Sequence, residues 1–362
     1  MSGLSKTKRA LFALAAVVIV LGVMEGALRI AGFRYQRTMS YMEFNFPEPH
    51  TLHKIFTPDQ ELLWKMRPGY RMGEGFPPLN RQGFRGADFE QRKGEGMFRV
   101  ACLGDSVTFG GVEATFPELL EEHLEEGLGM PVEVMNFGVP GYSSFQGRKL
   151  AEEVLEKYRP DAVVVLFGWN DHWLAKGYSD HRQRTDPPAA GRLLETAGRS
   201  RVYQLISRAA AAFASDEERP LVLRVPPDNF KANISAICSL AESRGTKVVL
   251  ATAPSAIETG KVPDYLVHNR FIKNEQDLKP LHGKYNRLVR ELSNEKNIPL
   301  ADLDLIFRRG DVTSLFDDPE QDIIHPNSKG YGIMAREIGK TILTNELYKN
   351  SERPLESDGR SP

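Results

Sequence analysis

The chain has 362 residues and a formal net charge of −1. Basic and acidic residues are interspersed, so the sequence has neither a basic footprint for nucleic acid nor an acidic tail, and we expect no polyanionic partner. A chain of this length can bury a large core, and we interpret it as one main domain with extensions. Cys102 and Cys238 have neither disulfide-framework nor metal-site spacing and are predicted to be buried free thiols.

The first residues have the pattern of a membrane-directed segment. Lys6, Lys8 and Arg9 precede an uncharged apolar run over residues 10–24. A run of about 15 residues fits a signal peptide as easily as a short membrane span. Length alone therefore leaves two interpretations open, an uncleaved anchor and a cleaved signal.

Two details favour an uncleaved anchor over residues 1–33. No convincing cleavage site with small residues follows Met24, and no cysteine lies nearby for lipid attachment. Glu25 and Arg29 are four residues apart, so in a helix they lie on one face and can pair. Such a pair extends the segment toward the length that a bilayer requires.

The charges that flank the apolar run predict its orientation. The three cationic residues before it favour a cytoplasmic N-terminus, although Arg29, Arg34 and Arg37 on the other side weaken the asymmetry. We therefore expect a single-pass protein of the bacterial inner membrane with its main domain in the periplasm. If the segment is cleaved, the protein is secreted instead.

Residues 34–97 are rich in proline, glycine and aromatic side chains. The segment Arg67-Pro68-Gly69-Tyr70 is a turn signal, but residues such as Trp64 and Phe84 make the whole stretch too apolar for a solvated linker. We expect an ordered extension packed on the main domain, which we assign to residues 98–348. Residues 349–362 are polar and are predicted to form a disordered tail.

From residue 98 onward, short apolar runs alternate with helical patterns. The predicted strands are Phe98–Leu103, Val132–Asn136, Ala162–Phe167, Lys247–Ala253 and Pro299–Leu303. The predicted helices are Pro117–Leu128, Phe145–Tyr158, Asp228–Arg244, Leu281–Asn297 and Ser328–Leu347. Continuous apolar strands that alternate with helices indicate a parallel sheet covered on both faces. The predicted fold is a three-layer α/β/α sandwich with a central parallel five-stranded sheet, carrying an insert over about residues 172–224.

Residues able to support catalysis follow the strands of this predicted sheet, where open α/β sheets bind ligands. Gly104-Asp105-Ser106 follows the first strand, the loop over residues 136–141 the second, and Gly168-Trp169-Asn170-Asp171 the third. Asp322 and His325 precede the final helix. A serine becomes a nucleophile beside a base, and the base works best when a carboxylate holds its tautomer.

Four blocks in this order resemble the SGNH (GDSL) hydrolase family over about two thirds of the chain. The resemblance implies a flavodoxin-like SGNH hydrolase fold, with Ser106 as nucleophile, His325 as general base and Asp322 as the carboxylate that orients it. It also implies an oxyanion hole made by the backbone N–H groups of Ser106 and Gly138 and the side-chain amide of Asn170. An uncharged amide can donate to a developing oxyanion without any change of charge.

Each of these residues has a structural alternative when it is considered alone. Ser106 or Asn170 could cap a helix, and Gly138 could serve only the turn. Three further residues are candidates for lining the substrate site: Trp169, His172 and Trp173. For Trp169, packing in the core or on the surface is an equal alternative. No metal or other cofactor is expected, because the histidines lack ligand spacing.

The resemblance predicts a serine ester hydrolase that works through an acyl-enzyme. The predicted location outside the cytoplasm, together with a polar and aromatic insert, suggests an acetyl ester on a cell-envelope or exported glycan as substrate. One alternative is an O-acyltransferase that passes the acyl group to an extracellular polysaccharide. Another is a catalytically inactive protein that binds or organises glycans. A thioesterase or lysophospholipase would use the same mechanism.

Overall fold

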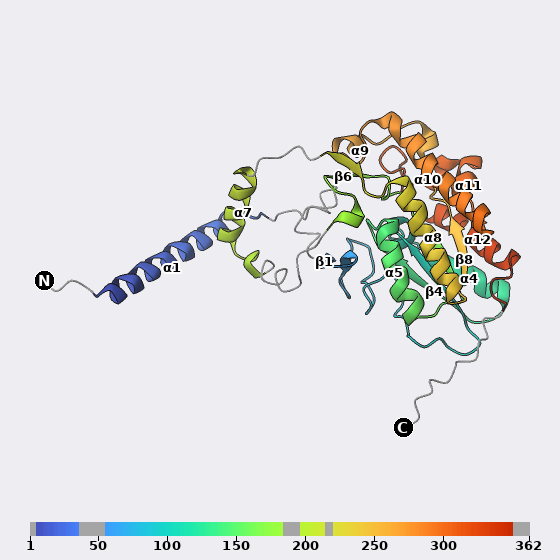
Figure 1. Ribbon diagram of the computed structural model, residues 1–362, viewed down its shortest axis with the longest axis horizontal. Coiled ribbons are helices and arrows are strands. Elements are labelled where there is room, and N and C mark those ends of the chain that lie inside the picture. The colour runs from blue at the N-terminus through green and yellow to red at the C-terminus, as the bar shows by residue number, and fades with distance from the viewer. Residues whose placement is uncertain (1–4, 36–54, 184–195, 214–219, 350–362) are drawn as a thin grey trace, which may run out of the picture.

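The apolar runs of the sequence form one parallel sheet at the centre of the structure (Figure 1). The computed structural model describes residues 5–35, 55–183, 196–213 and 220–349. In spatial order the strands of the sheet are β4 (Val132–Gly138), β3 (Phe98–Gly104), β5 (Ala162–Leu166), β8 (Lys247–Ala251) and β9 (Leu300–Ala301), and every neighbouring pair is parallel. This order is that of flavodoxin-like folds. The predicted five-stranded parallel sheet is confirmed.

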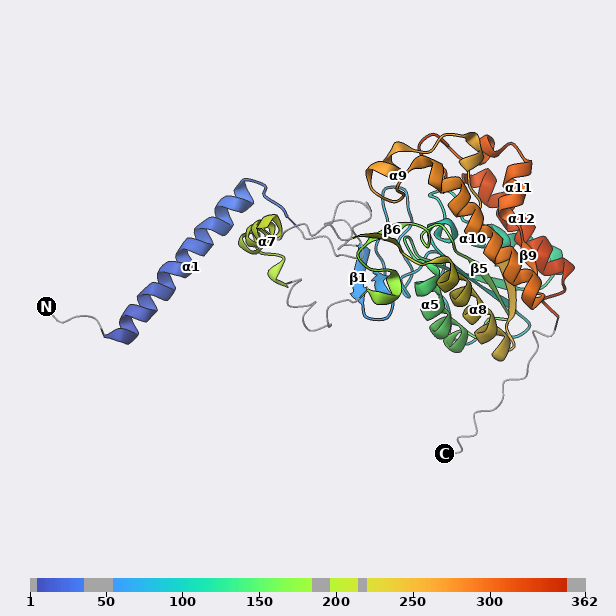
Figure 2. The ribbon, with the colours of Figure 1, turned by 45° about the horizontal axis from the view of Figure 1, so that its top comes forward.

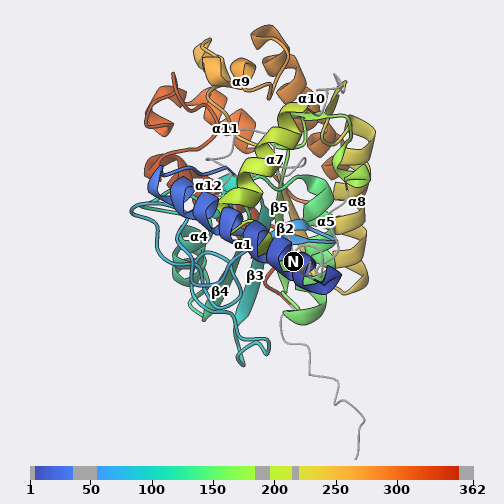
Figure 3. The same cartoon turned by 90° about the vertical axis from the view of Figure 1, so that its left-hand side faces the viewer.

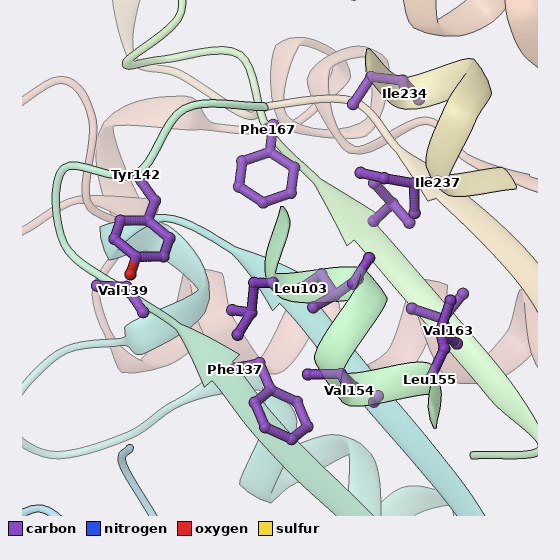
Figure 4. Packing of buried hydrophobic residues seen from close by; sticks show 14 of the residues in the cluster. Leu103, Phe137, Val139, Tyr142, Val154, Leu155, Val163, Phe167, Ile234 and Ile237 are labelled. Atoms are coloured by element: carbon purple, nitrogen blue, oxygen red, sulfur yellow. The ribbon is translucent and has the colours of Figure 1, made fainter. Parts of the chain in front are cut away.

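Helices cover both faces of the sheet, because successive strand side chains point to opposite faces. On β3, Leu103 faces the core under one helical layer and Cys102 faces the core under the other. The first layer contains α5 (Ser144–Lys157) and α8 (Pro227–Ser243), and the second contains α4 (Phe116–Leu128) and α12 (Ser328–Thr344). Figure 4 shows Leu103 and Phe137 of the sheet beside Val154 of α5. The three-layer architecture agrees with the prediction.

The predicted helix Leu281–Asn297 begins earlier in the structure, as α10 (Glu275–Lys296). Pro280 lies inside it, and a proline there obscures the helical pattern in the sequence. Glu275 and Asp277 in the first turn favour a helix start at this point, since carboxylates stabilise helix N-termini. Two further helices that the sequence did not indicate are α9 (Asp264–His268) and α11 (Leu303–Arg309).

Residues 55–97 share the core of the sheet domain. The hairpin of β1 (Phe56–Asp59) and β2 (Leu63–Met66) packs in the same cluster as Phe137. The Tyr142 hydroxyl donates a hydrogen bond to the Trp64 carbonyl at 2.6 Å, and Tyr142 lies in the loop after β4. The remainder of the predicted extension, residues 36–54, and the predicted tail after residue 349 lie outside the described residues.

The N-terminal segment forms α1 (Lys6–Ile30), a helix with no buried residues. At 1.5 Å per residue, its 25 residues extend over about 37 Å, and the helix is apolar and long enough to cross a bilayer. The predicted pair is present, with Arg29 Nε donating to Glu25 Oε1 at 2.8 Å. By length and composition α1 can serve as a membrane anchor or as a signal sequence.

The insert after β5 contributes a small hairpin and a helix. Strands β6 (Leu174–Lys176) and β7 (Leu221–Leu223) pair antiparallel beside the sheet domain. In the sequence, α7 (Arg201–Phe213) lies between β6 and β7. Figures 1, 2 and 3 show it next to α1. Parts of the predicted insert, residues 184–195 and 214–219, lie outside the described residues.

Candidate active site

The turn after β3 places Ser106 at the carboxyl edge of the sheet. β3 ends at Gly104, and Asp105 caps the short helix α3 (Ser106–Phe109), with its Oδ1 accepting a hydrogen bond from the Val107 N–H at 2.9 Å. Asp105 is fully buried, whereas Ser106 is partly exposed. The hydroxyl of Ser106 is therefore accessible on a turn that the buried aspartate holds in place.

Asp322 and His325 approach Ser106 from the loop before α12, and His325 lies 219 residues later in the chain than Ser106. His325 Nδ1 lies 2.7 Å from Asp322 Oδ2, and His325 Nε2 lies 2.8 Å from Ser106 Oγ. Asp322 Oδ1 also accepts the backbone N–H groups of Ile324 and His325, at 2.8 and 3.1 Å. An Nδ1–H that donates to Asp322 leaves the Nε2 lone pair to accept the serine proton. The structure thus brings the three predicted catalytic residues into one hydrogen-bonded line.

Charge and burial shift the pKa values of His325 and Asp322 in opposite directions. Burial alone would lower the pKa of His325, but the Asp322 carboxylate outweighs it and raises that pKa above its ordinary value. Burial alone would raise the pKa of Asp322, but His325 and the backbone N–H groups hold it below its ordinary value. The pair therefore favours a charged Asp322 and stabilises a proton on His325.

Asn170 is held beside Ser106, His325 and Asp322 by a hydrogen bond to Asp105. Its side-chain Nδ2 donates to Asp105 Oδ2 at 3.2 Å, and the residue is 8% exposed. Burial raises the pKa of Asp105 to about 6, against the opposing effects of the Val107 N–H, His325 and Asn170. An amide carries two N–H groups, so one donation leaves Asn170 with a second donor.

Gly138 does not offer the donor that was expected of it. Its N–H donates to Asn136 Oδ1 at 2.9 Å, so the predicted oxyanion role disagrees with the structure. A Cβ at this position would lie 2.2 Å from the backbone nitrogen of Phe109. The glycine is required because α3 passes directly over β4, and it supports the nucleophile turn instead of facing the substrate.

Gly141, three residues later, has a backbone N–H that is not used in a hydrogen bond among the described residues, as an oxyanion donor requires. Within the described part of the chain, the backbone N–H groups of Ser106 and Gly141 donate to no acceptor. Gly141 has a φ of +83°, which favours glycine. In the sequence, Val139-Pro140-Gly141 indicates a turn. This pattern does not show whether Gly138 or Gly141 offers its N–H to the substrate.

Trp169, His172 and Trp173 are not available to line a substrate site. They are 1%, 0% and 3% exposed. Trp169 Nε1 donates to the Pro254 carbonyl at 3.0 Å, and His172 Nε2 lies 3.1 Å from His282 Nδ1. The aromatic rings pack on one another beneath the third block, so the predicted lining role is corrected to a core role.

A buried ion pair that the sequence did not indicate holds the Gly141 loop. Arg224 and Asp180 come from the two ends of the insert, are 3% exposed each, and contact at 2.8 Å. Arg224 Nη1 also donates to the Gly141 carbonyl at 2.8 Å, and Ser143 Oγ donates to Asp180 Oδ2 at 2.7 Å. No local pattern marks these residues, because their partners are distant in sequence.

A model of the GDSL-like lipase/acylhydrolase family matches residues 102–333, a stretch that includes Ser106, Asn170 and His325. The chain belongs to this family. The resemblance to SGNH (GDSL) hydrolases is therefore confirmed, and this GDSL hydrolase is an ester-cleaving enzyme. No curated protein matches its sequence.

Several solved structures resemble this GDSL hydrolase at low sequence identity. A lipase/acylhydrolase from Enterococcus faecalis is 17% identical, with a TM-score of 0.44, over 68% of this chain and 96% of that one. A GDSL-like lipase from Bacteroides thetaiotaomicron is 19% identical, with a TM-score of 0.43, over 71% and 93%. An acetylxylan esterase from Geobacillus stearothermophilus is 17% identical, with a TM-score of 0.40, over 68% and 94%. Similarities this low carry no information on the substrate.

Proposed function

We propose that this enzyme cleaves its ester through an acyl-enzyme on Ser106. The observation that carries the proposal is the line from Ser106 Oγ through His325 to Asp322, with hydrogen-bond distances of 2.8 and 2.7 Å. Ser106 Oγ attacks the ester carbonyl carbon while its proton passes to His325 Nε2. Asp322 stabilises the imidazolium that forms and holds its orientation.

Collapse of the tetrahedral intermediate breaks the bond to the alcohol. His325 returns its proton to the departing alcohol oxygen, which leaves an ester on Ser106. Water then attacks this acyl-enzyme, with His325 again accepting a proton. The acid departs and Ser106 regains its hydrogen, so the cycle needs neither an oxidant nor a reductant.

The oxyanion of each intermediate requires preorganised donors. We assign this role to the N–H groups of Ser106 and Gly141 and to the side-chain amide of Asn170, with Gly141 in place of Gly138. Support comes from the hydrogen bond that occupies the Gly138 N–H and from the lack of an acceptor for the other two N–H groups within the described residues. Removing one such donor typically costs about 3–4 kcal/mol of barrier stabilisation.

For the substrate we propose a short acyl group, such as acetyl, on a cell-envelope or exported glycan. Tyr265 is 37% exposed, and burial followed by the charge of Asp322 raises its pKa to about 12. We propose that its ring faces the substrate. An exposed aromatic ring beside a hydrolytic site is suited to packing on a sugar ring. A main domain held outside the cytoplasm by α1 would meet such glycans.

The proposed organisation follows the same logic. Residues 1–33 would anchor the chain in the bacterial inner membrane, or direct secretion if they are cleaved. Residues 34–97 would extend the sheet domain over residues 98–348, with its insert at about residues 172–224 and a tail over 349–362. The main domain would then work in the periplasm.

Mass spectrometry of the products from a panel of acetylated glycans and lipid esters tests this function. The wild-type enzyme is expected to release free acid from acetylated glycans, and Ser106→Ala to release none while unfolding at the wild-type temperature. Ser239→Ala, which changes an exposed serine of α8, is the matched control and should keep full activity. A fluorophosphonate probe should label the wild type and Ser239→Ala only.

Three results would contradict the proposal. Full activity in Ser106→Ala would place the nucleophile elsewhere, and cleavage of long-chain lipid esters without any deacetylation would exclude the glycan substrate. Adding glycan acceptors separates hydrolysis from transfer. If acceptors diverted the product from free acid to acylated glycan, the enzyme would be an O-acyltransferase.

A further inference from the structure

We propose that α7 is a second membrane-contact element, which lies on the phospholipid surface against the C-terminal end of α1. The proposal depends on α1 being inserted in a bilayer and does not depend on the catalytic mechanism. Figures 1 and 2 show α1 and α7 side by side, set apart from the sheet domain.

Polar contacts from α1 hold the first turn of α7. Glu25 Oε2 accepts the Ser200 hydroxyl at 2.9 Å and the Val202 N–H at 3.0 Å. Arg29 Nη2 donates to the Arg199 carbonyl at 3.1 Å. The first N–H groups of a helix have no partner within it. Glu25 supplies an acceptor for α7 from a different helix, 177 residues earlier in the chain.

The segment that follows α1 in the chain makes further contacts with α7. The Tyr35 N–H donates to Gln204 Oε1 at 3.0 Å, and the guanidinium of Arg208 lies 5.9 Å from the centre of the Phe33 ring. Residues 25–35 therefore contact α7 from its first turn to Arg208. This length of contact defines how α7 lies relative to the end of α1.

The sequence of α7 is amphipathic with a period of 3.6 residues. Val202, Leu205, Ile206 and Ala209 recur on one side, and the opposite side carries Arg201, Gln204 and Arg208. Val202 is 8% exposed, whereas Ile206 is 61% exposed and Tyr203 36%. Part of the apolar side thus packs toward α1, and part is left open.

Apolar side chains of both helices line a groove of about 510 Å³ between them. Its apolar walls are Leu21, Val202, Tyr203 and Ile206. Leu21 belongs to the uncharged run of α1, one turn closer to the membrane interior than Glu25. If that run lies in hydrocarbon, the groove opens where lipid chains begin, so phospholipid is the occupant that its position predicts.

Charge around the groove favours the same occupant. Arg29 and Arg199 line the groove together with Glu25. Residues 25–35 and 196–213 carry five arginines, against the single acidic residue Glu25. An interfacial helix characteristically combines a basic polar face with an apolar face directed into the acyl boundary. Lipid phosphates complement this excess of arginine.

This arrangement would attach the catalytic domain to the membrane at two points. The insert that contains α7 returns to the sheet domain through the β6–β7 hairpin, and its ends form the buried Arg224–Asp180 pair beside the Gly141 loop. A second attachment limits how far the site can move from the bilayer surface, and so restricts which esters it reaches.

The test measures contact with lipid at single positions of the full-length protein in liposomes of phosphatidylcholine and phosphatidylglycerol. An environment-sensitive fluorophore is attached to Ile206→Cys, with Ser207→Cys on the polar side as the matched control. Cys102 and Cys238 are fully buried and should not react. Phospholipids that carry a shallow nitroxide should quench the label at 206 several-fold more than the label at 207, and aqueous iodide should show the reverse.

Equal quenching by lipid at the two positions would overturn the proposal, as would quenching of both labels by iodide alone. Leu205→Cys provides a second reporter on the apolar side should Ile206→Cys unfold. In a Glu25→Ala background, lipid quenching at position 206 should fall, because the first turn of α7 loses its acceptor on α1. Unchanged quenching there would contradict the docking of α7 on α1, as would a label at 206 shielded by a second copy of the chain instead of lipid.

Discussion

At the scale of single residues, the hydrogen bonds that each polar group already makes determine the geometry of the site. Asp322 uses one carboxylate oxygen on two backbone N–H groups and the other on His325. Its position is therefore set before any substrate binds. This leaves the imidazole with one tautomer that serves Ser106, which is the arrangement that a general base requires.

The pH dependence of activity follows from the pKa of His325. The base must be neutral to accept the Ser106 proton, so activity should rise with pH through that pKa. Because Asp322 raises the pKa above its ordinary value of 6.5, the acid limb of kcat/KM should have its midpoint above pH 6.5. A midpoint well below this value would contradict the assignment of His325.

Asp322→Asn should separate the two contributions of the carboxylate. Loss of its charge should move the acid limb to lower pH, while loss of the correct tautomer should lower kcat on the order of 10³–10⁴-fold. Rates measured across the pH range check both effects. A normal kcat in a properly folded Asp322→Asn enzyme would remove this residue from the triad.

Asn170→Ala tests the proposed oxyanion donor. If the free N–H of this amide faces the developing charge, kcat should fall roughly 10²–10³-fold while KM changes little. The thermal unfolding temperature distinguishes this effect from damage to the Asp105 contact. An unchanged kcat would show that Asn170 serves only to hold Asp105.

Gly138→Ala should behave as a folding mutation. The added Cβ meets the Phe109 backbone at 2.2 Å, so β4 or α3 must shift, at a cost on the order of 3 kcal/mol. Denaturant unfolding of Gly138→Ala measures the cost. A variant as stable as the wild type would mean that α3 can move freely away from β4.

At the scale of elements, the insert and the loop after β4 depend on one another. Arg224 joins β7 to Gly141 and Asp180, and its guanidinium also lies 5.8 Å from the Trp64 ring centre, on the first hairpin. Three segments distant in sequence thus meet at one buried cation. The conformation of the proposed oxyanion loop is set by this contact as well as by its own turn residues.

Removing Arg224 should therefore be costly. Arg224→Leu leaves the Asp180 carboxylate buried without its partner, and the stability should fall by about 3–5 kcal/mol. Asp180→Asn in the same chain removes the unpaired charge and should restore part of that loss. Unfolding free energies of the two single variants and the double variant measure the coupling, and strict additivity would contradict it.

At the scale of the whole molecule, the structure combines a sheet domain with a helical pair that extends away from it (Figure 1). The proposed catalytic residues lie at the carboxyl edge of the sheet, and the only helix among the described residues with the length and composition of a membrane span is α1. No residue of α1 is buried, so its apolar surface needs lipid or removal.

Intact-mass measurement distinguishes these two outcomes. If α1 is an anchor, the protein from the membrane fraction should keep the full mass of 40.6 kDa. The reason is that the segment offers no convincing cleavage site after its apolar run. A soluble protein that lacks the first residues would instead establish a cleaved signal.

The strands, most helices and the candidate residues Ser106, Asp322 and His325 could be predicted from the sequence because their signals are local. A buried parallel strand is a continuous apolar run, and the first three functional blocks directly follow such runs, whereas Asp322 and His325 directly precede the final helix. The Glu25–Arg29 pair was predictable for the same reason, since four residues of helix determine its geometry. The start of α10 was missed because Pro280 interrupts its local pattern.

The tertiary structure was needed to show the contacts of residues whose partners are remote in the chain. The sequence by itself determined the fold class, the family and the candidate nucleophile with its base, because these are encoded in periodicity and in short motifs. Only the tertiary structure decided that the Phe109 backbone packs against Gly138, that Trp169 is buried, and that Arg224 holds the Gly141 loop. Hydrogen bonding and burial depend on which distant segments meet in space, and no local pattern records that.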